Sequence, residues 1–396
     1  MKPLVISAEE RAVRRERIEQ KMQEAGIKGA VIFSPTSIFY LVGFHFIPTE
    51  RPMALVLTDG RTTLFVPRLE HEHAEAVSDA DTVKSYPEYP SELHPMRRLA
   101  QLLGELGLRG VKIGVDADGY GSSWGYRGPR LSEVLPEADV APGVGMWVEE
   151  MRMSKSDAEI AFIRESCRWG NLAHVLLQRY SVAGAREIDI SMRATSEATS
   201  AMIDTLGPIY RAAGSASASA GFRGQIGPNS ALPHAVTINA ILKQGDTLVT
   251  GAGADIYGYH SELERTMFVG EPNTEQRRFF EHMLAAQDLA ISLIKPGIPC
   301  SAIEQEMQRF YKENNLVPYT RHHTGHNIGL QGHEMPFLDL GDETILQPGM
   351  LFTIEPGFYV EGLGGFRHSD TIVVTKDGSE SLTYYPRQLE DLICGV

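Results

Sequence analysis

The stretch LVTGAGADIYGYHSELERTMF, Leu248–Phe268, contains the residues from which the fold can best be predicted. Two short apolar runs, 248–250 and 266–269, enclose several glycines and the carboxylates Glu262 and Glu264. Short apolar runs bounded by glycine predict strands. We therefore expect a strand pair with two carboxylates between its strands, which is either a solvated surface hairpin or the edge of a site.

Four motifs around this stretch favour a site. PHAVT begins at Pro233, and TGHNIG, TIEPG and GFRHSD begin at Thr324, Thr353 and Gly365. His234 follows a proline in a stiff segment, where an imidazole is held in one orientation, so it is a candidate for proton transfer or substrate binding.

The whole chain is expected to form two domains, because 396 residues are more than a single hydrophobic core usually accommodates. We expect an α/β domain over 1–150, with a helix over 7–25 and a hairpin turn at Asp59-Gly60. The polar run 143–157 predicts a linker. The remaining chain, 151–396, alternates helical patterns with short, glycine-rich strands, which is typical of an α+β domain with helices on a curved, mainly antiparallel sheet.

Composition excludes several classes of partner. A net charge of -14 provides no basic surface for nucleic acid or an anionic membrane. The three cysteines are widely separated, the N-terminus is charged, and no apolar run approaches the roughly 18 residues of a membrane span. These features predict a cytoplasmic protein.

The segment RHHTGHNIGLQGHEMP contains four histidines, and a cluster of this kind is typical of a metal site or a catalytic site. His326 stands between Gly325 and Gly329, which let a ligand approach the backbone. Glu355 ends an apolar run, and a buried carboxylate there needs a partner. Arg367 belongs to the last of the motifs.

The motif order PH, GYHSE, TGHxxG, EPG and GFRxxD resembles the creatinase/prolidase family, which includes Xaa-Pro aminopeptidases, prolidase, creatinase and ectoine hydrolase. SPTSIFYLVGF and ERPMALVLTDG are similar to the N-terminal domain of that family, so the resemblance covers essentially the whole chain. It implies a pita-bread catalytic domain preceded by a smaller α/β domain of the creatinase type. It also implies a homodimer with a shared active site.

The metallopeptidase members of this family bind two divalent metals through Asp, Asp, His, Glu and Glu. The matching positions here are Gly251, Glu262, His326, Glu355 and Ser369. Glycine has no side chain, and serine is a poor ligand for a hard divalent ion, so a dinuclear site is not expected. We expect no cofactor; the alternative is one Mn, Co or Zn ion held by Glu262, His326 and Glu355.

The metal-independent creatinase is similar in the set His234, Glu264, His326 and Glu355. Arg51 matches the arginine that holds creatinase's substrate carboxylate across the dimer, or else forms a surface salt bridge. The likeness is incomplete. His333 and Ser369 stand where creatinase has an arginine and a histidine, so creatine itself is not the expected substrate.

The leading hypothesis is therefore metal-free hydrolysis of a non-peptide carbon–nitrogen bond in a small carboxylate-bearing compound. His234 would activate water, Glu264 and Glu355 would hold a cationic group, and His326 would donate to the leaving nitrogen. Glu262 is the nucleophile of an alternative covalent route.

Substrate-binding candidates are Arg51, His333 and Arg367. Two other functions stay open: a divergent Xaa-Pro dipeptidase or aminopeptidase with one metal, and an inactive member that acts as a binding module.

Overall fold

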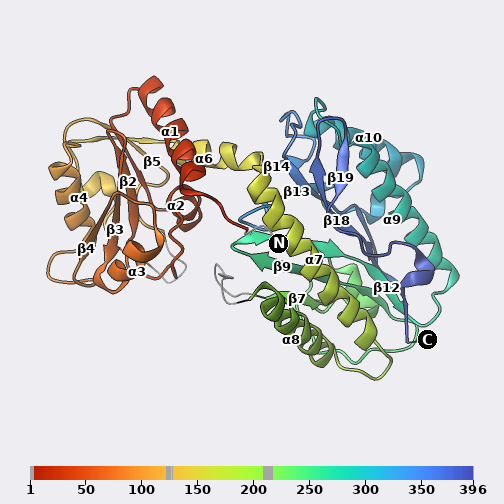
Figure 1. Cartoon of the computed structure of the whole chain (residues 1–396). Coiled ribbons are helices and arrows are strands. Elements are labelled where there is room, and N and C mark those ends of the chain that lie inside the picture. The colour runs from red at the N-terminus through yellow and green to blue at the C-terminus, as the bar shows by residue number, and fades with distance from the viewer. Residues whose placement is uncertain (1–3, 122–125, 127, 208–216, 396) are drawn as a thin grey trace. The chain divides into compact units, whose positions relative to one another are not determined.

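The computed structural model describes residues 4–121, 126, 128–207 and 217–395. The chain forms two compact units, one ending at Arg152 and the other beginning at Met153. Each unit has its own sheets and helices (Figure 1).

The N-terminal unit contains one six-stranded sheet in the order β4-β3-β2-β1-β5-β6. The pairs β1–β2 and β2–β3 are antiparallel, and the other three pairs are parallel. The strands are β1 (Gly29–Ile32), β2 (Ala54–Thr58), β3 (Arg61–Pro67), β4 (Thr82–Tyr86), β5 (Lys112–Val115) and β6 (Asp139–Pro142). The helices are α1 (Ala8–Glu24), α2 (Pro35–Val42), the 3-10 turn η1 (Arg68–Glu70), α3 (His71–Val77), α4 (Pro95–Glu105), α5 (Leu131–Val134) and α6 (Val144–Met153).

Local signals account for the first elements. The Ser7 side chain accepts a hydrogen bond from the backbone N–H of Glu10 and caps α1. Asp59 and Gly60 both have positive φ, 50° and 73°, which is the turn that the Asp-Gly pair predicts. The expected linker over 143–157 contains the boundary between the two units, at Arg152 and Met153, but it has regular structure. Most of it forms the helix α6, because Val144 and Val148 are buried one turn apart on the same face.

The C-terminal unit contains a nine-stranded sheet in which β10-β9-β11-β18-β15-β13-β14 are neighbours, β7 pairs with β9 and β19 with β18. Smaller sheets join β20-β12-β8 and β16-β17. The early strands are β7 (Ala218–Gly221), β8 (Thr247–Val249), β9 (Gly251–Ile256), β10 (Tyr259–His260), β11 (Leu263–Glu264), β12 (Thr266–Val269) and β13 (Gly325–Asn327). The later ones are β14 (Glu334–Leu338), β15 (Leu351–Ile354), β16 (Gly357–Val360), β17 (Gly364–Arg367), β18 (Ser369–Val374), β19 (Ser379–Ser381) and β20 (Ile393–Cys394).

Helices pack along this sheet system in two groups. Figure 1 shows α7 (Asp157–Tyr180) and α8 (Glu187–Leu206) beside β7 and β9, and α9 (Thr274–Leu293) and α10 (Cys300–Glu313) beside the later strands. Short 3-10 turns are η2 (Gly227–Ala231), η3 (Val317–Tyr319) and η4 (Leu389–Leu392). The expected α+β arrangement, with helices on a mainly antiparallel sheet after an α/β unit, is confirmed. None of the described helices is long and apolar enough to cross a membrane.

The stretch 248–268 forms the predicted strand pair. β8 and β12 are antiparallel, with Val249 opposite Thr266. Between them the chain makes β9, β10 and β11, and β11 joins the middle of the nine-stranded sheet through β18. The two carboxylates therefore lie at the centre of a sheet rather than at a solvated hairpin tip.

A buried histidine beside this stretch predicts acid sensitivity. His174 on α7 is 0% exposed, its Nε2 lies 2.7 Å from Thr250 Oγ1, and burial lowers its pKa to about 3. In the unfolded chain a histidine titrates near 6.5, so the unfolded state binds more protons between these values. We expect the free energy of unfolding to fall with decreasing pH below about 6.5, by up to about 1.4 kcal/mol per pH unit from this group.

Urea unfolding at several pH values between 4.5 and 7.5 measures this slope. His174→Gln removes the buried titrating ring and is expected to give a shallower slope, whereas replacing the exposed His73 is expected to leave it unchanged. Equal slopes in wild type and His174→Gln would contradict the prediction.

Candidate active site

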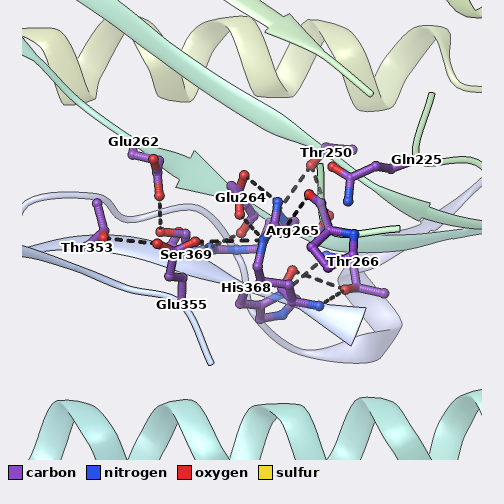
Figure 2. A network of polar contacts seen from close by, with 12 residues as sticks. Gln225, Thr250, Glu262, Glu264, Arg265, Thr266, Thr353, Glu355, His368 and Ser369 are labelled. Atoms are coloured by element: carbon purple, nitrogen blue, oxygen red, sulfur yellow. Dashed lines mark hydrogen bonds and ion pairs between the residues drawn. The ribbon is translucent and has the colours of Figure 1, made fainter. Parts of the chain in front are cut away.

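The charged residues of the motifs meet on four adjacent strands, β11-β18-β15-β13. Glu264 lies opposite Ser369 in the β11–β18 pair, and the backbone N–H of Glu262 donates a 3.1 Å hydrogen bond to Thr371 Oγ1 in β18. Glu355 directly follows β15, and His326 lies in β13. Figure 2 shows Glu262, Ser369 and Glu355 grouped together, with Glu264 beside them. The site is therefore built from segments far apart in sequence.

Glu262, His326 and Glu355 form a set of potential metal ligands whose ligand atoms all lie within 4.8 Å of one another. His326 Nδ1 lies 3.0 Å from the carbonyl oxygen of Asn327, so the Nδ1–H donates there and Nε2 keeps its lone pair. His326 Nε2 is buried and makes no hydrogen bond to any residue that the structure describes, although Glu355 Oε1 is 3.1 Å away. Two carboxylates and an imidazole in this tautomer fit one divalent cation.

The pKa values of the three side chains are shifted by burial and by the charges around them. Burial raises the pKa of Glu262, and the charges of Glu355 and Glu264 raise it further. Burial also acts to raise the pKa of Glu355, but its contact with His326 and the charge of Arg367 outweigh burial and lower it. Burial disfavours the charged His326, yet the neighbouring carboxylates raise its pKa overall. A divalent cation between these groups would stabilise both carboxylates in the ionised form.

The two positions expected to lack ligands for a second ion, Gly251 and Ser369, carry no metal-ligating carboxylate. Gly251 has no side chain, and the Ser369 hydroxyl donates a 2.7 Å hydrogen bond to Glu262 Oε1. Within the described part of the chain, the set of Glu262, His326 and Glu355 is the one group of three or more metal-ligating side chains. The geometry fits one ion rather than two.

Glu264 is buried and bound by two arginines. Arg367 donates from both Nε and Nη2 to its carboxylate, and Nη2 lies 2.8 Å from Oε1. Arg223 Nη2 also lies 2.8 Å from Oε1. Arg367 Nη1 further donates to the hydroxyl of Tyr359, which lies 2.8 Å from a ring nitrogen of His322. The charge of Glu264 is thus taken up by protein guanidinium groups.

A fully buried arginine connects the strands of the site by hydrogen bonds. Arg265 is 0% exposed and donates to backbone oxygens of Glu264 and Ser369 and to Asp370 Oδ1, at 2.7 to 3.0 Å. It also donates to the carbonyl oxygens of Pro386 and Tyr385. It lies at the centre of the network in Figure 2. Arg265 therefore ties β11 and β18, which carry site residues, to the segment near the C-terminus.

The candidate residues His333, His234 and Arg51 do not belong to the set of potential metal ligands. The His333 ring stacks on His326, with ring centroids 3.8 Å apart. His234 is exposed, and the carbonyl oxygen of its neighbour Pro233 lies 3.4 Å from Arg367 Nη1. Arg51 lies in the N-terminal unit, where its guanidinium forms 2.7 Å ion pairs with Glu50 and Glu88; this matches the alternative of a surface salt bridge.

A cavity of about 480 Å³ opens beside the ligand set. Its lining residues come from β7 and the residues on either side of it, from β9 and β10, and from β11 with the two residues before it. They are Ser217, Ser219, Ala220, Gly221, Arg223, Gly251, Ala252, Gly253, Ala254, Asp255, His260, Ser261, Glu262 and Glu264. Most of these side chains are small, and the charged ones are one arginine and three carboxylates.

Three site residues were not anticipated as such: Arg223, Arg265 and Tyr359. Arg265 stands next to Glu264 in an otherwise apolar strand run, which is a signal for a buried ion pair. Tyr359 follows EPGF as part of an apolar run, and Arg223 stands in a loop without a pattern. Nothing in the local sequence links the last two to the site.

Profiles of two known domains match the chain. Residues 161–376 match metallopeptidase family M24, and residues 14–154 match the creatinase/prolidase N-terminal domain. The first match alone covers more than half of the chain, and together they follow the order of the two structural units.

Individual relatives agree with these matches. A protein named Xaa-Pro dipeptidase from Pyrococcus horikoshii is 28% identical over 384 residues, covering 94% of this chain and 97% of the relative. Among solved structures, an Xaa-Pro dipeptidase from Bacillus anthracis is 27% identical with a TM-score of 0.79, covering 96% of this chain and 99% of its own. The prolidase from Pyrococcus horikoshii OT3 has a TM-score of 0.78 at 28% identity, covering 95% and 99%.

Proposed function

The chain belongs to metallopeptidase family M24, and from this premise we propose that it hydrolyses Xaa-Pro dipeptides with one divalent metal ion bound by Glu262, His326 and Glu355. The observation that carries the proposal is the set of three ligand atoms within 4.8 Å, with the buried Nε2 of His326 directed at it. Relatives named Xaa-Pro dipeptidase and prolidase, matched over almost their whole length, support the substrate class.

The expectation of a metal-independent, creatinase-like hydrolase without a cofactor is wrong. The matched profile is that of a metallopeptidase family, and the relatives compared above are Xaa-Pro dipeptidases or prolidases. The error has a physical source. Losing the side chains at Gly251 and Ser369 removes ligands for a second ion, but it leaves three good donors for the first. Homodimer formation and cytoplasmic location stay predictions.

Glu262, His326 and Glu355 would hold the ion, which when bound would supply Lewis-acid chemistry for the carbonyl group of the scissile bond. Residues of the chain provide positioning, proton transfer and charge balance. The hydrogen bond from His326 Nδ1 to Asn327 keeps the coordinating nitrogen in place. We assign proton transfer to the leaving amine to His333, whose exposed ring stacks on His326. Arg367 is fixed by Glu264 and Tyr359 and balances the charge of Glu355, whose carboxylate lies 3.9 Å away.

Elemental analysis and a dipeptide assay test the proposal together. The purified protein, loaded with Mn, Co or Zn and desalted, is expected to hold one ion per chain and to release proline from dipeptides such as glycyl-proline. Glycyl-alanine, which has a secondary amide, serves as the matched substrate control and is expected to be cleaved much more slowly. Binding of two ions per chain would contradict the one-ion site. Metal binding without any peptide cleavage would favour the binding module.

A further inference from the structure

We propose that Lys155 is a positioning residue of the active site. Through Asn327 it fixes the peptide group that orients the metal ligand His326, and through Glu334 it fixes the loop that carries His333. This inference rests on the proposed function and extends it to a residue that lies outside the ligand set and the cavity lining.

The ammonium group of Lys155 is buried in the catalytic unit. The side chain of Lys155 is 2% exposed, and that of Glu334 is 5% exposed. Lys155 Nζ donates to Glu334 Oε2 at 3.1 Å and also to Asn327 Oδ1. The backbone N–H of Lys155 donates a 2.9 Å hydrogen bond to the carbonyl oxygen of Gly349. The residue is therefore held by both its backbone and its side chain.

Asn327 connects Lys155 to the metal ligands. Its buried side chain accepts a hydrogen bond from Lys155 and donates one of 2.9 Å from Nδ2 to the carbonyl oxygen of Met153. Its own carbonyl oxygen lies 3.0 Å from His326 Nδ1, and this hydrogen bond leaves the lone pair of Nε2 for the ion. The β13–β14 pairing shifts register between His326 and Asn327, so the ladder is irregular at this peptide group. Lys155 thus holds the residue whose carbonyl group orients His326.

Glu334 connects Lys155 to the loop 328–333. Its Oε2 accepts from Lys155, and its Oε1 accepts a 2.9 Å hydrogen bond from the backbone N–H of Gln331. Gly329 packs directly on the ion pair. A Cβ atom at Gly329 would lie 2.8 Å from Lys155 Cε and 2.9 Å from Glu334 Oε2. The ion pair therefore determines the path of this loop.

His333 ends the loop and directly precedes Glu334. Its ring stacks on that of His326, with ring centroids 3.8 Å apart. Because the His333 side chain is exposed, its position depends on the backbone that carries it. Lys155 and Glu334 hold that backbone.

Stability alone does not explain a buried ion pair at this place. Removing an ammonium and a carboxylate from water costs free energy that their attraction only roughly offsets, so an apolar pair of similar volume is often as stable. Charged hydrogen bonds differ from apolar contacts because they have a direction. Those of Lys155 are directed at Asn327 and Glu334, which are the sequence neighbours of His326 and His333.

Titration of the metal-stripped full chain with Mn²⁺ tests the inference without any peptide substrate. Lys155→Met is expected to weaken Mn²⁺ binding about 10- to 100-fold, the range for losing an outer partner of a metal ligand. At saturating Mn²⁺, kcat for glycyl-proline is expected to fall by a similar factor, with KM within about threefold of wild type. Arg14→Met is the matched control, because it removes a buried cation of the N-terminal unit. It is expected to keep the wild-type affinity and kcat.

Two further variants separate positioning from a general loss of stability. Lys155→Met combined with Glu334→Gln removes both charges of the buried pair, and it is expected to fold and to show the same weakened Mn²⁺ binding. Asn327→Ala keeps the carbonyl group that accepts from His326 but loses the side chain that Lys155 holds. Since Lys155 acts on His326 through Asn327, Lys155→Met combined with Asn327→Ala is expected to bind Mn²⁺ about as weakly as the weaker single variant.

Wild-type Mn²⁺ affinity in folded Lys155→Met would overturn the inference and leave the proposed function in place. Losses that multiply when Lys155→Met and Asn327→Ala are combined would do the same. An equal weakening in Arg14→Met would also overturn the inference, because the effect would then follow from any loss of stability. Mn²⁺ binding that depends on Lys155, in a protein that cleaves no Xaa-Pro dipeptide, would support the inference and overturn the proposed function.

Discussion

His326→Ala is expected to lower kcat/KM for glycyl-proline on the order of 10³-fold and to abolish stoichiometric metal binding. The side chain supplies the one nitrogen donor of the set, and without it two carboxylates remain that repel each other in a buried place. Metal content by elemental analysis and initial rates at saturating metal measure the two effects. The wild-type protein treated with a chelator is expected to show the same residual rate, and one equivalent of metal is expected to restore it.

His282→Ala is the matched control for this variant, since His282 is a half-buried histidine on α9 that belongs neither to the ligand set nor to the cavity lining. It is expected to keep full activity and metal content. If His326→Ala retains one tightly bound ion per chain and normal rates, the assignment of the metal site is wrong.

Arg265→Met is expected to reduce the free energy of unfolding by about 3–5 kcal/mol, because it removes one partner of a fully buried ion pair. Asp370 keeps hydrogen bonds from Thr383 and Gln287, and Arg387 stays 3.8 Å away, but Asp370 loses the guanidinium group that donates to it. The carbonyl groups of Glu264 and Ser369 also lose a donor. Denaturant unfolding with the same probe for all variants measures the effect.

Adding Asp370→Asn to Arg265→Met is expected to recover part of the lost stability, because the uncompensated buried charge is then gone. Arg164→Met is the control. Its ion pair with Glu380 is about half exposed, and a loss below about 1 kcal/mol is expected. A similarly small loss for Arg265→Met would show that the buried pair contributes little net stability.

Much of the fold could be predicted from local patterns. The Ser7 cap, the Asp59-Gly60 turn and the strand pair of 248–268 follow from rules that act over a few residues. The helix within 143–157 has the opposite cause. A segment rich in polar residues forms the helix α6 because two valines on one face find a core to pack against, and that core is made by distant parts of the chain.

The three potential metal ligands were expected from the motifs, but the ion pairs around them were not. Glu262, His326 and Glu355 were recognised from their motifs, and the structure brings them together. Glu264 was expected to hold a cationic substrate group, but it is engaged by two arginines of the protein.

The sequence by itself determined which side chains are available: two carboxylates and one imidazole that can bind an ion, and the absence of ligands at Gly251 and Ser369. Only the tertiary structure decided how their charges are balanced. Arg223 is 41 residues from Glu264, and Arg367 is 103 residues away, so no local rule relates them. Ion pairing depends on distance in space and on burial. The folded sheet therefore determines which arginines pair with Glu264.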